Sequence, residues 1–516
     1  MGFREIILKL PTDYTRAQLE KQIAKKLQLK SFTFQIERKS LDARKKHDIH
    51  WQLQVGVVSE ELKSGVSPDQ PVLSIPYRTR KKKVVVIGSG PAGFFAAFVL
   101  QKAGFDTTIL ERGTEVSKRA QDIALFEDTG HFSANSNYAF GEGGAGTFSD
   151  GKLTSRTKNI TAEKDYMIRS YVAADAPAEI AYLAHPHIGS DNLRIVVQNL
   201  RERFQNDGGT ILFETMLHDI VAKGGHVTDI ITSAGTLQPD ELIVATGHSA
   251  YETYRMLIRR GLHFRAKNFA IGYRAEHRQQ LINLAQWGDE RLPGVKAAEY
   301  RLTARATDRP VYTFCMCPGG TVVPATAYAN TNIVNGMSDY QRQGTFANAA
   351  IVAGVHPDEL LGREASAIDT LDYLADLEAQ FFEYSKSYAA PCCSIHDFMN
   401  KRETDQPLQS SYPLGLKQAP LWSMLPAAVT AAIRTGLNEF ARKLAGYDTG
   451  ILLGLESKTS APVQVARERH GLCQGFDNLY MVGEGSGWAG GIISSGVDGI
   501  RAAKSIIDET QILSFI

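Results

Sequence analysis

The sequence has few cysteines, no long apolar run and almost no net charge, and each shortage excludes a class of protein. Its 516 residues contain 5 cysteines, an odd and sparse set that argues against a disulfide framework and favours a reducing compartment. No run reaches the ~18 apolar residues of a membrane-spanning helix, and residues 1–15 lack the apolar segment of a signal peptide. We therefore expect a cytoplasmic protein with no membrane partner.

The positive and negative charges nearly cancel, with 57 Lys and Arg against 56 Asp and Glu. A net charge of +1 gives no broad field to attract nucleic acid, so we expect no nucleic-acid partner. Cys and His do not occur at the spacing of a metal site, and we expect no metal. A hydrophobic content of 43% is typical of a globular protein, and the length suggests two or three domains.

The most informative segment is VVVIGSGPAG, residues 84–93, a short apolar run followed by a glycine-rich turn. In such a turn Gly88, Gly90 and Gly93 permit the tight bend, the approach of a pyrophosphate and close packing of the following helix. The next apolar segment ends at Glu111, about 20 residues further on, where a carboxylate can bind ribose hydroxyls. This order predicts a dinucleotide site. Its expected contacts are Gly88, Ser89, Gly90, Pro91, Ala92, Gly93, Glu111 and Arg112.

Two further segments indicate which dinucleotide is bound. LYMVGEGSGWAGG, residues 479–491, resembles the C-terminal element of the glutathione-reductase-type FAD superfamily, in which an acid binds the ribitol and a helix N-terminus faces the flavin. LIVATG, residues 242–247, resembles the turn that closes the FAD domain, although alone it would indicate only a buried strand. Together the three segments favour FAD over NAD. The resemblance implies contacts from Ala245, Thr246, Gly247, Gly483, Glu484, Gly490, Gly491 and Ile492.

Another glycine-rich segment, residues 137–156, follows the ribose-binding acid. In related flavoproteins this part of the chain passes under the cofactor, where backbone N–H groups reach the pyrophosphate and the flavin. We favour this interpretation over a mobile surface loop. The expected contacts are Gly144, Gly146, Ser149 and Lys152.

The whole chain resembles a largely uncharacterised bacterial family of FAD-dependent dehydrogenases that carry an extra N-terminal domain. The resemblance rests on segments that span nearly all of the chain: KSLDARKK at 39–46, GGAGTFSDGKL at 143–153, CMCPGG at 315–320, NGMS at 335–338, SYPLG at 411–415, ESKTSAPV at 456–463 and GEGSGWAGGI at 483–492. Lys458 stands where the family pattern has arginine, and a lysine keeps the charge but loses the bidentate fork. The resemblance implies the cofactor and the fold, but not the substrate.

We expect an α/β fold with a Rossmann-type FAD-binding domain, an inserted α+β substrate domain and a small N-terminal α+β domain. The expected divisions are 1–80 for the N-terminal domain, 81–250 and 446–516 for the two parts of the FAD-binding domain, and 251–445 for the substrate domain. Within the substrate domain, the patterns predict strands over 270–276 and 311–316 and a largely helical segment over 345–440. No second GxGxxG follows a strand, so we expect no separate NAD(P)H domain.

The N-terminal segment should fold in the order β-α-β-β, with a helix over 15–27 that Thr15 caps. A basic stretch, residues 38–48, separates the last two expected strands. We interpret this stretch as a solvated hairpin loop. The alternative is a docking site for a protein, an acidic cofactor or RNA.

The catalytic residues are not evident from any motif, and Lys458, Cys315 and Cys317 are the candidates. For the CxC pair we expect one cysteine to line a pocket and the other to pack in the core, with a redox dithiol as the alternative. Lys458 belongs to a polar cluster that follows an apolar strand, where it could bind an acidic substrate or stabilise reduced flavin. His248, directly after the LIVATG turn, could reach the flavin or cap a helix.

These patterns predict an FAD-dependent oxidoreductase that passes a hydride between flavin N5 and a small, anionic or unsaturated organic substrate. Free NAD(P)H or a redox partner protein would complete the cycle. The alternative is a flavoprotein that binds or modifies RNA or a protein partner through its N-terminal domain.

Overall fold

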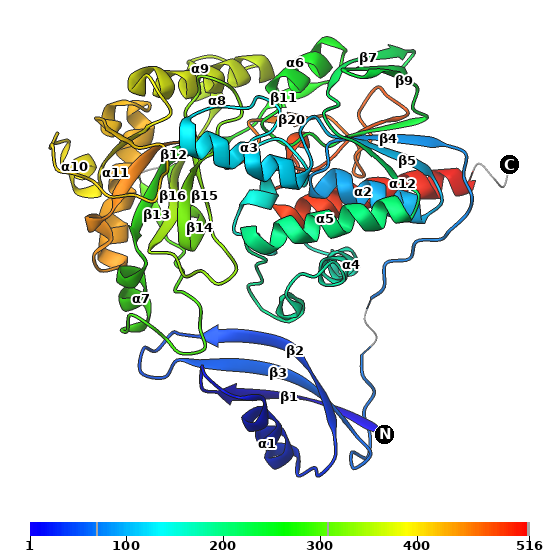
Figure 1. The fold of residues 1–516 in the computed structure, drawn as a ribbon, viewed down its shortest axis with the longest axis vertical. Coiled ribbons are helices and arrows are strands. Elements are labelled where there is room, and N and C mark those ends of the chain that lie inside the picture. Colours follow the sequence, from blue (N-terminus) through cyan, green and yellow to red (C-terminus); the bar gives the residue numbers. More distant parts are fainter. Residues whose placement is uncertain (69–70, 307–308, 513–516) are drawn as a thin grey trace.

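The computed structural model describes residues 1–68, 71–306 and 309–512. Two large sheets lie side by side, and a small N-terminal sheet lies beneath them at the end of an extended linker (Figure 1). Within those residues, no helix is long and apolar enough to cross a membrane. The predicted α/β class, with a parallel sheet, is confirmed.

The N-terminal unit is an antiparallel sheet in the order β1-β3-β2, with one helix against it. Its elements are β1 (Gly2–Leu10), α1 (Arg16–Leu27), β2 (Thr33–Asp42) and β3 (His50–Ser59). The predicted β-α-β-β order is confirmed, and the side chain of Thr15 accepts a hydrogen bond from the N–H of Gln18 as an N-cap should. Leu19 and Ile23 of α1 are buried against the sheet.

The basic stretch at 38–48 is only partly a loop, because its first five residues belong to β2. The outer edge of β2 is paired with the main body of the protein. The N–H of Lys39 donates to the carbonyl of Tyr182 at 2.8 Å, and the N–H of Ala184 donates to the carbonyl of Lys39 at 2.9 Å. The predicted hairpin loop starts too early, because residues 38–42 continue the pairing of β2 with β3 as far as Asp42 and His50.

The first large sheet is parallel, in the order β21-β10-β4-β5-β6. Its strands are β4 (Lys83–Ile87), β5 (Asp106–Leu110), β6 (Thr210–Leu212), β10 (Glu241–Val244) and β21 (Leu479–Met481). Alternate residues of β4 join different cores: Val84 and Val86 pack against helices, whereas Val85 and Ile87 pack on the opposite face. Burial on both faces explains why these strands are continuous apolar runs.

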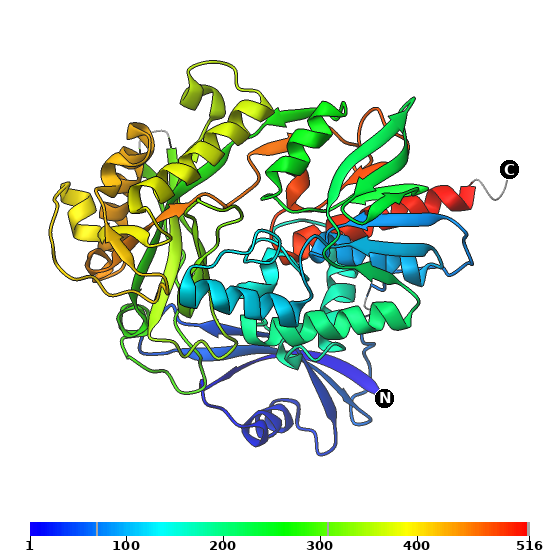
Figure 2. The same ribbon diagram turned by 45° about the horizontal axis from the view of Figure 1, so that its top comes forward.

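One face of this sheet is covered by α2 (Pro91–Lys102) and α12 (Ile492–Ile512), which lie side by side in both views (Figures 1 and 2). The helices approach closely because a glycine faces the neighbouring backbone: a Cβ on Gly499 would lie 2.0 Å from the carbonyl oxygen of Ala92. The other elements of this part are α3 (Val116–Thr129), α4 (Thr161–Val172), α5 (Ser190–Asn206), β7 (Leu217–Lys223), β8 (His226–Thr232) and β9 (Gly235–Leu237).

The second large sheet is mixed, in the order β13-β14-β16-β12-β19-β17-β18, with β15 paired to β14. Its strands are β12 (Phe269–Arg278), β13 (Thr303–Ala306), β14 (Arg309–Pro324), β15 (Val334–Met337), β16 (Phe346–Val355), β17 (Ala390–Ser394), β18 (Leu416–Gln418) and β19 (Ile451–Glu456). The strands predicted over 270–276 and 311–316 are confirmed as parts of β12 and β14. Because β19 belongs here, the chain completes this sheet before it returns to the parallel one.

The segment predicted to be helical over 345–440 begins instead with the strand β16. Its sequence, FANAAIVAGV, is almost wholly buried, and it pairs with β12 on one edge and β14 on the other. Alanine occurs in both helices and strands, so the pairing of both edges with neighbouring strands makes this segment a strand. The helices around this sheet are α6 (Tyr251–Arg259), α7 (Gln279–Trp287), α8 (Pro357–Leu361), α9 (Ala367–Ser385), α10 (Ile395–Asn400) and α11 (Ala427–Lys443). The short strands β11 (Phe264–Ala266) and β20 (Val463–Val465) pair antiparallel.

Candidate functional site

A cavity of about 1730 Å³ lies between the carboxyl ends of the parallel strands and the second sheet. Ligands of open α/β sheets bind at this end of the strands. The volume exceeds the roughly 300–1,000 Å³ of an ordinary small-molecule pocket, so it has room for a large cofactor and a second molecule. Every predicted cofactor contact lines this cavity except Ser89 and Gly93.

Glycine backbone forms part of the cavity surface. A Cβ on Gly247 or Gly491 would meet no atom within 4 Å, and one on Gly90 would meet only Gly144 Cα, at 3.8 Å. The first turns of two helices also open on the cavity, α2 at Pro91 and α12 at Ile492. Free N–H groups at helix N-termini favour anionic groups, so this surface suits a pyrophosphate and the electron-rich edge of a flavin.

The carboxylate of Glu111 is held rigidly at the end of β5. It accepts hydrogen bonds from the N–H and Oγ of Ser89, at 3.1 and 2.6 Å, and from the N–H groups of Gly113 and Gly141, at 2.9 and 3.2 Å. Ser89 therefore supports the acid from outside the cavity. Gly93 also acts from outside the cavity. A Cβ at this position would lie 2.0 Å from the carbonyl oxygen of Gly88, so only glycine leaves room for that oxygen.

The glycine-rich segment at 137–144 is organised by Arg119, a fully buried residue of α3. Its guanidinium donates hydrogen bonds of 2.7 to 3.2 Å to the carbonyl groups of Asn137, Tyr138, Gly141, Glu142 and Gly144. Burial lowers the pKa of Arg119 to about 10, against the raising effect of nearby acids. Sequence reasoning missed this residue, because one arginine in a polar helix gives no sign that it points inward.

His248 lines the cavity, and one of its ring nitrogens has no hydrogen-bond partner among the described residues. Its Nδ1 lies 3.5 Å from Oε2 of Glu484, which also lines the cavity. Its Nε2 is buried and has no hydrogen-bond partner among the described residues. Buried polar atoms are rarely unpartnered, so a turn of the ring that brought this nitrogen to the cavity would give it a partner in a bound molecule.

Outside the predicted cofactor contacts, the cavity lining carries more cations than anions. The basic residues there are Arg156, Lys164, Arg301, Arg305 and Lys443, and the acidic ones are Asp150, Glu299 and Glu439. All three acids have cationic partners. Asp150 and Glu299 pair with Arg342, at 2.7 and 3.6 Å. Glu439 pairs with Lys443 at 3.3 Å. This part of the cavity therefore favours an anionic molecule.

Strand β14 bulges where it borders the cavity. Its pairing with β16 shifts register between Phe314 and Cys317, and Cys315 adopts a φ of 47°, in the left-handed region. Cys315 lines the cavity, whereas Cys317 is fully buried. Beneath them Arg274 donates to the carbonyl of Cys315 at 2.8 Å. Sequence reasoning also missed this contact, although a charged residue inside the apolar strand AIGYRAE is a signal that could have found it.

Lys152 connects the glycine-rich segment to β14. Its ammonium donates to the carbonyl of Met316 and lies 3.5 Å from the carboxylate of Asp150. Asp150 also accepts two hydrogen bonds from Arg342, at 3.1 and 2.7 Å. Although burial acts in the other direction, Lys152 and Arg342 hold the pKa of Asp150 below its usual range.

Lys458 lies in an internal network and does not line the cavity. Its ammonium is 2.8 Å from Glu378 and 2.5 Å from the hydroxyl of Tyr251, and its side chain is 5% exposed. Of the same polar cluster, Thr459 and Ser460 reach the cavity. The charge of Lys458 is thus already balanced within the protein.

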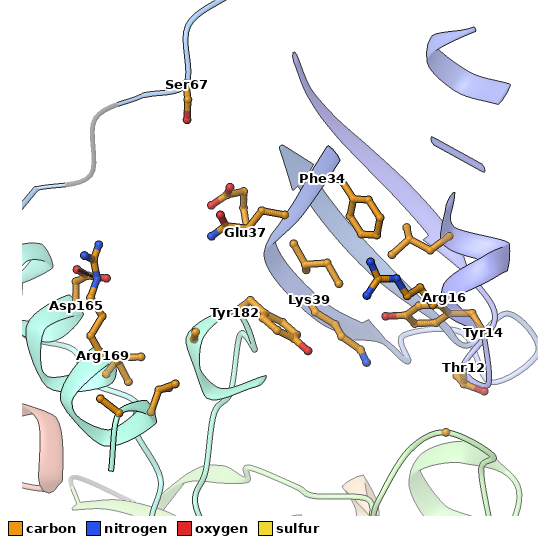
Figure 3. Close-up of a pocket in the computed structure, with 18 of the residues that line it drawn as sticks. Thr12, Tyr14, Arg16, Phe34, Glu37, Lys39, Ser67, Asp165, Arg169 and Tyr182 are labelled. Atoms are coloured by element: carbon orange, nitrogen blue, oxygen red, sulfur yellow. Dashed lines mark ion pairs between the residues drawn. The ribbon is translucent and has the colours of Figure 1, made fainter. Parts of the chain in front are cut away.

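A second hollow, of about 1340 Å³, separates the N-terminal sheet from α4 and the segment after it (Figure 3). Tyr14 and Lys39 line it on one side, and Arg169 and Tyr182 on the other. The ammonium of Lys39 lies 5.2 Å from the ring centre of Tyr14, and Arg169 pairs with Asp165 at 2.7 Å. These cations have partners within the chain, so the hollow does not favour the alternative of a nucleic-acid module.

Comparisons with known proteins agree with this architecture. Residues 82–252 match the family model of pyridine nucleotide-disulphide oxidoreductases, and residues 268–459 match a model described as FAD-dependent protein, C-terminal domain-like. Residues 3–58 match a domain of unknown function. These three matches cover most of the chain.

Two relatives differ greatly in how much of the chain they match. A protein of Clostridium beijerinckii described as uncharacterized is 37% identical over 532 aligned positions, which cover 99% of both chains. An L-glutamate oxidase precursor of Streptomyces viridosporus is 43% identical, but over only 12% of this chain and 9% of its own. Among solved structures, glycine oxidase from Geobacillus kaustophilus is 12% identical with a TM-score of 0.37, over 83% of this chain and 95% of its own.

Proposed function

This chain belongs to a family of FAD-dependent oxidoreductases, and on that premise we propose that it transfers a hydride between FAD and a small anionic organic substrate. One observation carries the proposal: a single cavity joins nearly all predicted FAD contacts to a lining rich in arginine and lysine. Bound FAD supplies a two-electron centre that accepts or donates a hydride at N5. The chain's own residues must therefore hold the cofactor, orient the substrate and manage its proton.

The cofactor contacts divide by the part of FAD that each would hold. The turn at 88–93 and the first turn of α2 suit the pyrophosphate, and Glu111 suits the ribose hydroxyls. Glu484 suits the ribitol, and the N-terminus of α12 suits the flavin edge, where it would stabilise negative charge. The open glycine surface supports this fit.

The substrate would lie against β13 and β14, with its acidic group toward Arg301 and Arg305. His248 would hold or move the substrate proton at Nε2, which is buried in this structure and would have to turn toward the cavity. Glu484 favours the tautomer with the proton on Nδ1, which leaves Nε2 free to accept. Free NAD(P)H or a redox protein would exchange the second pair of electrons.

An anaerobic titration of the purified protein tests the proposal. We expect the visible bands of oxidised flavin, and bleaching of these bands by NADH or NADPH, or by one member of a panel of small organic acids. Replacement of Arg301 and Arg305 by glutamine should raise the KM for the acid and leave the flavin spectrum unchanged. A colourless protein, or a flavin that no nicotinamide, acid or redox protein reduces, would contradict the proposal.

A further inference from the structure

We propose that Cys315 and Cys317 form a redox-active dithiol that exchanges two electrons with FAD in the cavity. The pair lies on β14 of the second sheet, and no cysteine occurs in residues 82–252, the part that matches the disulphide oxidoreductase model. The inference needs bound FAD, but it does not depend on which organic substrate the enzyme takes. It rests on the position of the two cysteines on one bulged strand, on the charges around them and on the access of Cys315 to the cavity.

The bulge of β14 turns Cys317 back toward its neighbour. The thiol of Cys317 donates a hydrogen bond to the carbonyl oxygen of Cys315, 3.4 Å away. Successive Cα atoms are about 3.8 Å apart, so residues two apart on a bent chain fall near the roughly 4.4–6.8 Å Cα separation of disulfides. A disulfide can therefore form with a local adjustment of β14.

The two thiols have opposite acid strengths. The hydrogen bond from Cys317 and the charges of Lys152 and Arg274 lower the pKa of Cys315 to about 6, against the effect of burial. The hydrogen bond with Cys315 and burial raise the pKa of Cys317. At neutral pH the pair is thus one thiolate and one thiol, the combination that a reactive dithiol uses.

Access to the cavity distinguishes this pair from the other cysteines. Cys315 lines the cavity together with Gly146 and Lys152, two of the predicted cofactor contacts. Cys317 lies behind it and is fully buried. The remaining cysteines, Cys392, Cys393 and Cys473, do not line the cavity, and burial raises the pKa of each.

The exchange balances without a further reactant. In the oxidising direction, the Cys317 S–H bond breaks, an S–S bond forms between Cys315 and Cys317, and two electrons pass to FAD. The proton from Cys317 passes to the flavin, so thiolate, thiol and oxidised FAD give a disulfide and anionic reduced FAD. The reverse reaction restores the dithiol. The enzyme would thus store a second pair of electrons beside the flavin.

Counting electrons tests the proposal on the FAD-loaded protein. After oxidation with diamide and removal of the oxidant, an anaerobic dithionite titration should consume four electrons per FAD, two for the flavin and two for the disulfide. Cys315→Ser and Cys317→Ser should each consume two. Cys473→Ala, a buried cysteine remote from the cavity, is the control and should still consume four.

Thiol counting gives a second readout that needs no variant. After denaturation, the reduced protein should react with alkylating agent at all 5 cysteines, and the diamide-treated protein at two fewer. The peptide that contains residues 315–317 should then have lost two hydrogen atoms. A yellow protein that consumes only two electrons and keeps every thiol alkylatable would overturn the dithiol and leave the proposed hydride transfer standing.

Discussion

The guanidinium of Arg274 lies 2.8 Å from the carboxylate of Glu456, and both side chains are buried. The two residues come from neighbouring strands, β12 and β19, under the β14 bulge. Burial raises the pKa of Glu456 to about 6, although Arg274 opposes this effect. Removal of the cation would leave a buried carboxylate without its partner.

We predict that Arg274→Met lowers the free energy of unfolding by about 3–5 kcal/mol, the usual result of breaking one side of a buried pair. Denaturant unfolding of the FAD-loaded protein measures the change. Arg16→Met is the matched control, because Arg16 pairs with Glu20 at the exposed surface and should change stability little. If both substitutions lowered the free energy of unfolding equally, the buried ion pair would stabilise the fold no more than the exposed one.

Gly90 and Gly93 should separate cofactor binding from folding. A Cβ on Gly90 projects into the cavity and clashes with nothing in the protein, so Gly90→Ala should weaken FAD binding with little change in the stability of the apoprotein. A Cβ on Gly93 would lie 2.0 Å from a backbone oxygen, so Gly93→Ala should destabilise the fold itself. Fluorescence titration with FAD measures the affinity of both variants, and thermal unfolding measures their stability. The prediction is contradicted if both variants lose the same affinity and the same stability.

Arg119→Met should weaken FAD binding by tenfold or more, on the order of 1.4 kcal/mol, because several buried carbonyl groups lose their shared donor. Arg119→Lys should recover part of the loss, since an ammonium can reach only some of these oxygens. Equilibrium dialysis of FAD measures both affinities. Arg169→Met, on the exposed face of α4, is the control and should bind FAD normally.

The Cys315 thiolate should persist well below neutral pH. In the reduced protein, the ultraviolet absorbance of the thiolate, taken as wild type minus Cys315→Ser, should rise with pH around a midpoint of about 6. Lys152→Gln removes a nearby positive charge that stabilises the anion, so the midpoint should move to higher pH. A midpoint near that of an ordinary cysteine, unchanged by Lys152→Gln, would remove the electrostatic support for the dithiol.

Local chemistry explains what could be predicted from the sequence. The turn at 88–93 could be recognised because two of its constraints are local: Gly88 has a positive φ, and Gly93 lies against the carbonyl oxygen of Gly88. The adjacent strands also carry continuous apolar runs. The strand β16 could not be recognised in the same way, because its alanines suit a helix equally well. Its structure is decided by pairing with β12 and β14, which are distant in sequence. The inward-pointing Arg119 and the internal pairing of Lys458 also depend on partners remote in sequence.

The position of β21 has a consequence for how the protein is made. This strand lies beside β10, and α12 then packs on α2, whose residues 92–100 are all buried. A ribosome releases β21 and α12 long after α2, so the nascent chain emerges with an apolar helix that lacks its cover. The nucleotide-binding fold can therefore close only after residues 479–512 have left the ribosome, and this interval is when the chain needs a chaperone most.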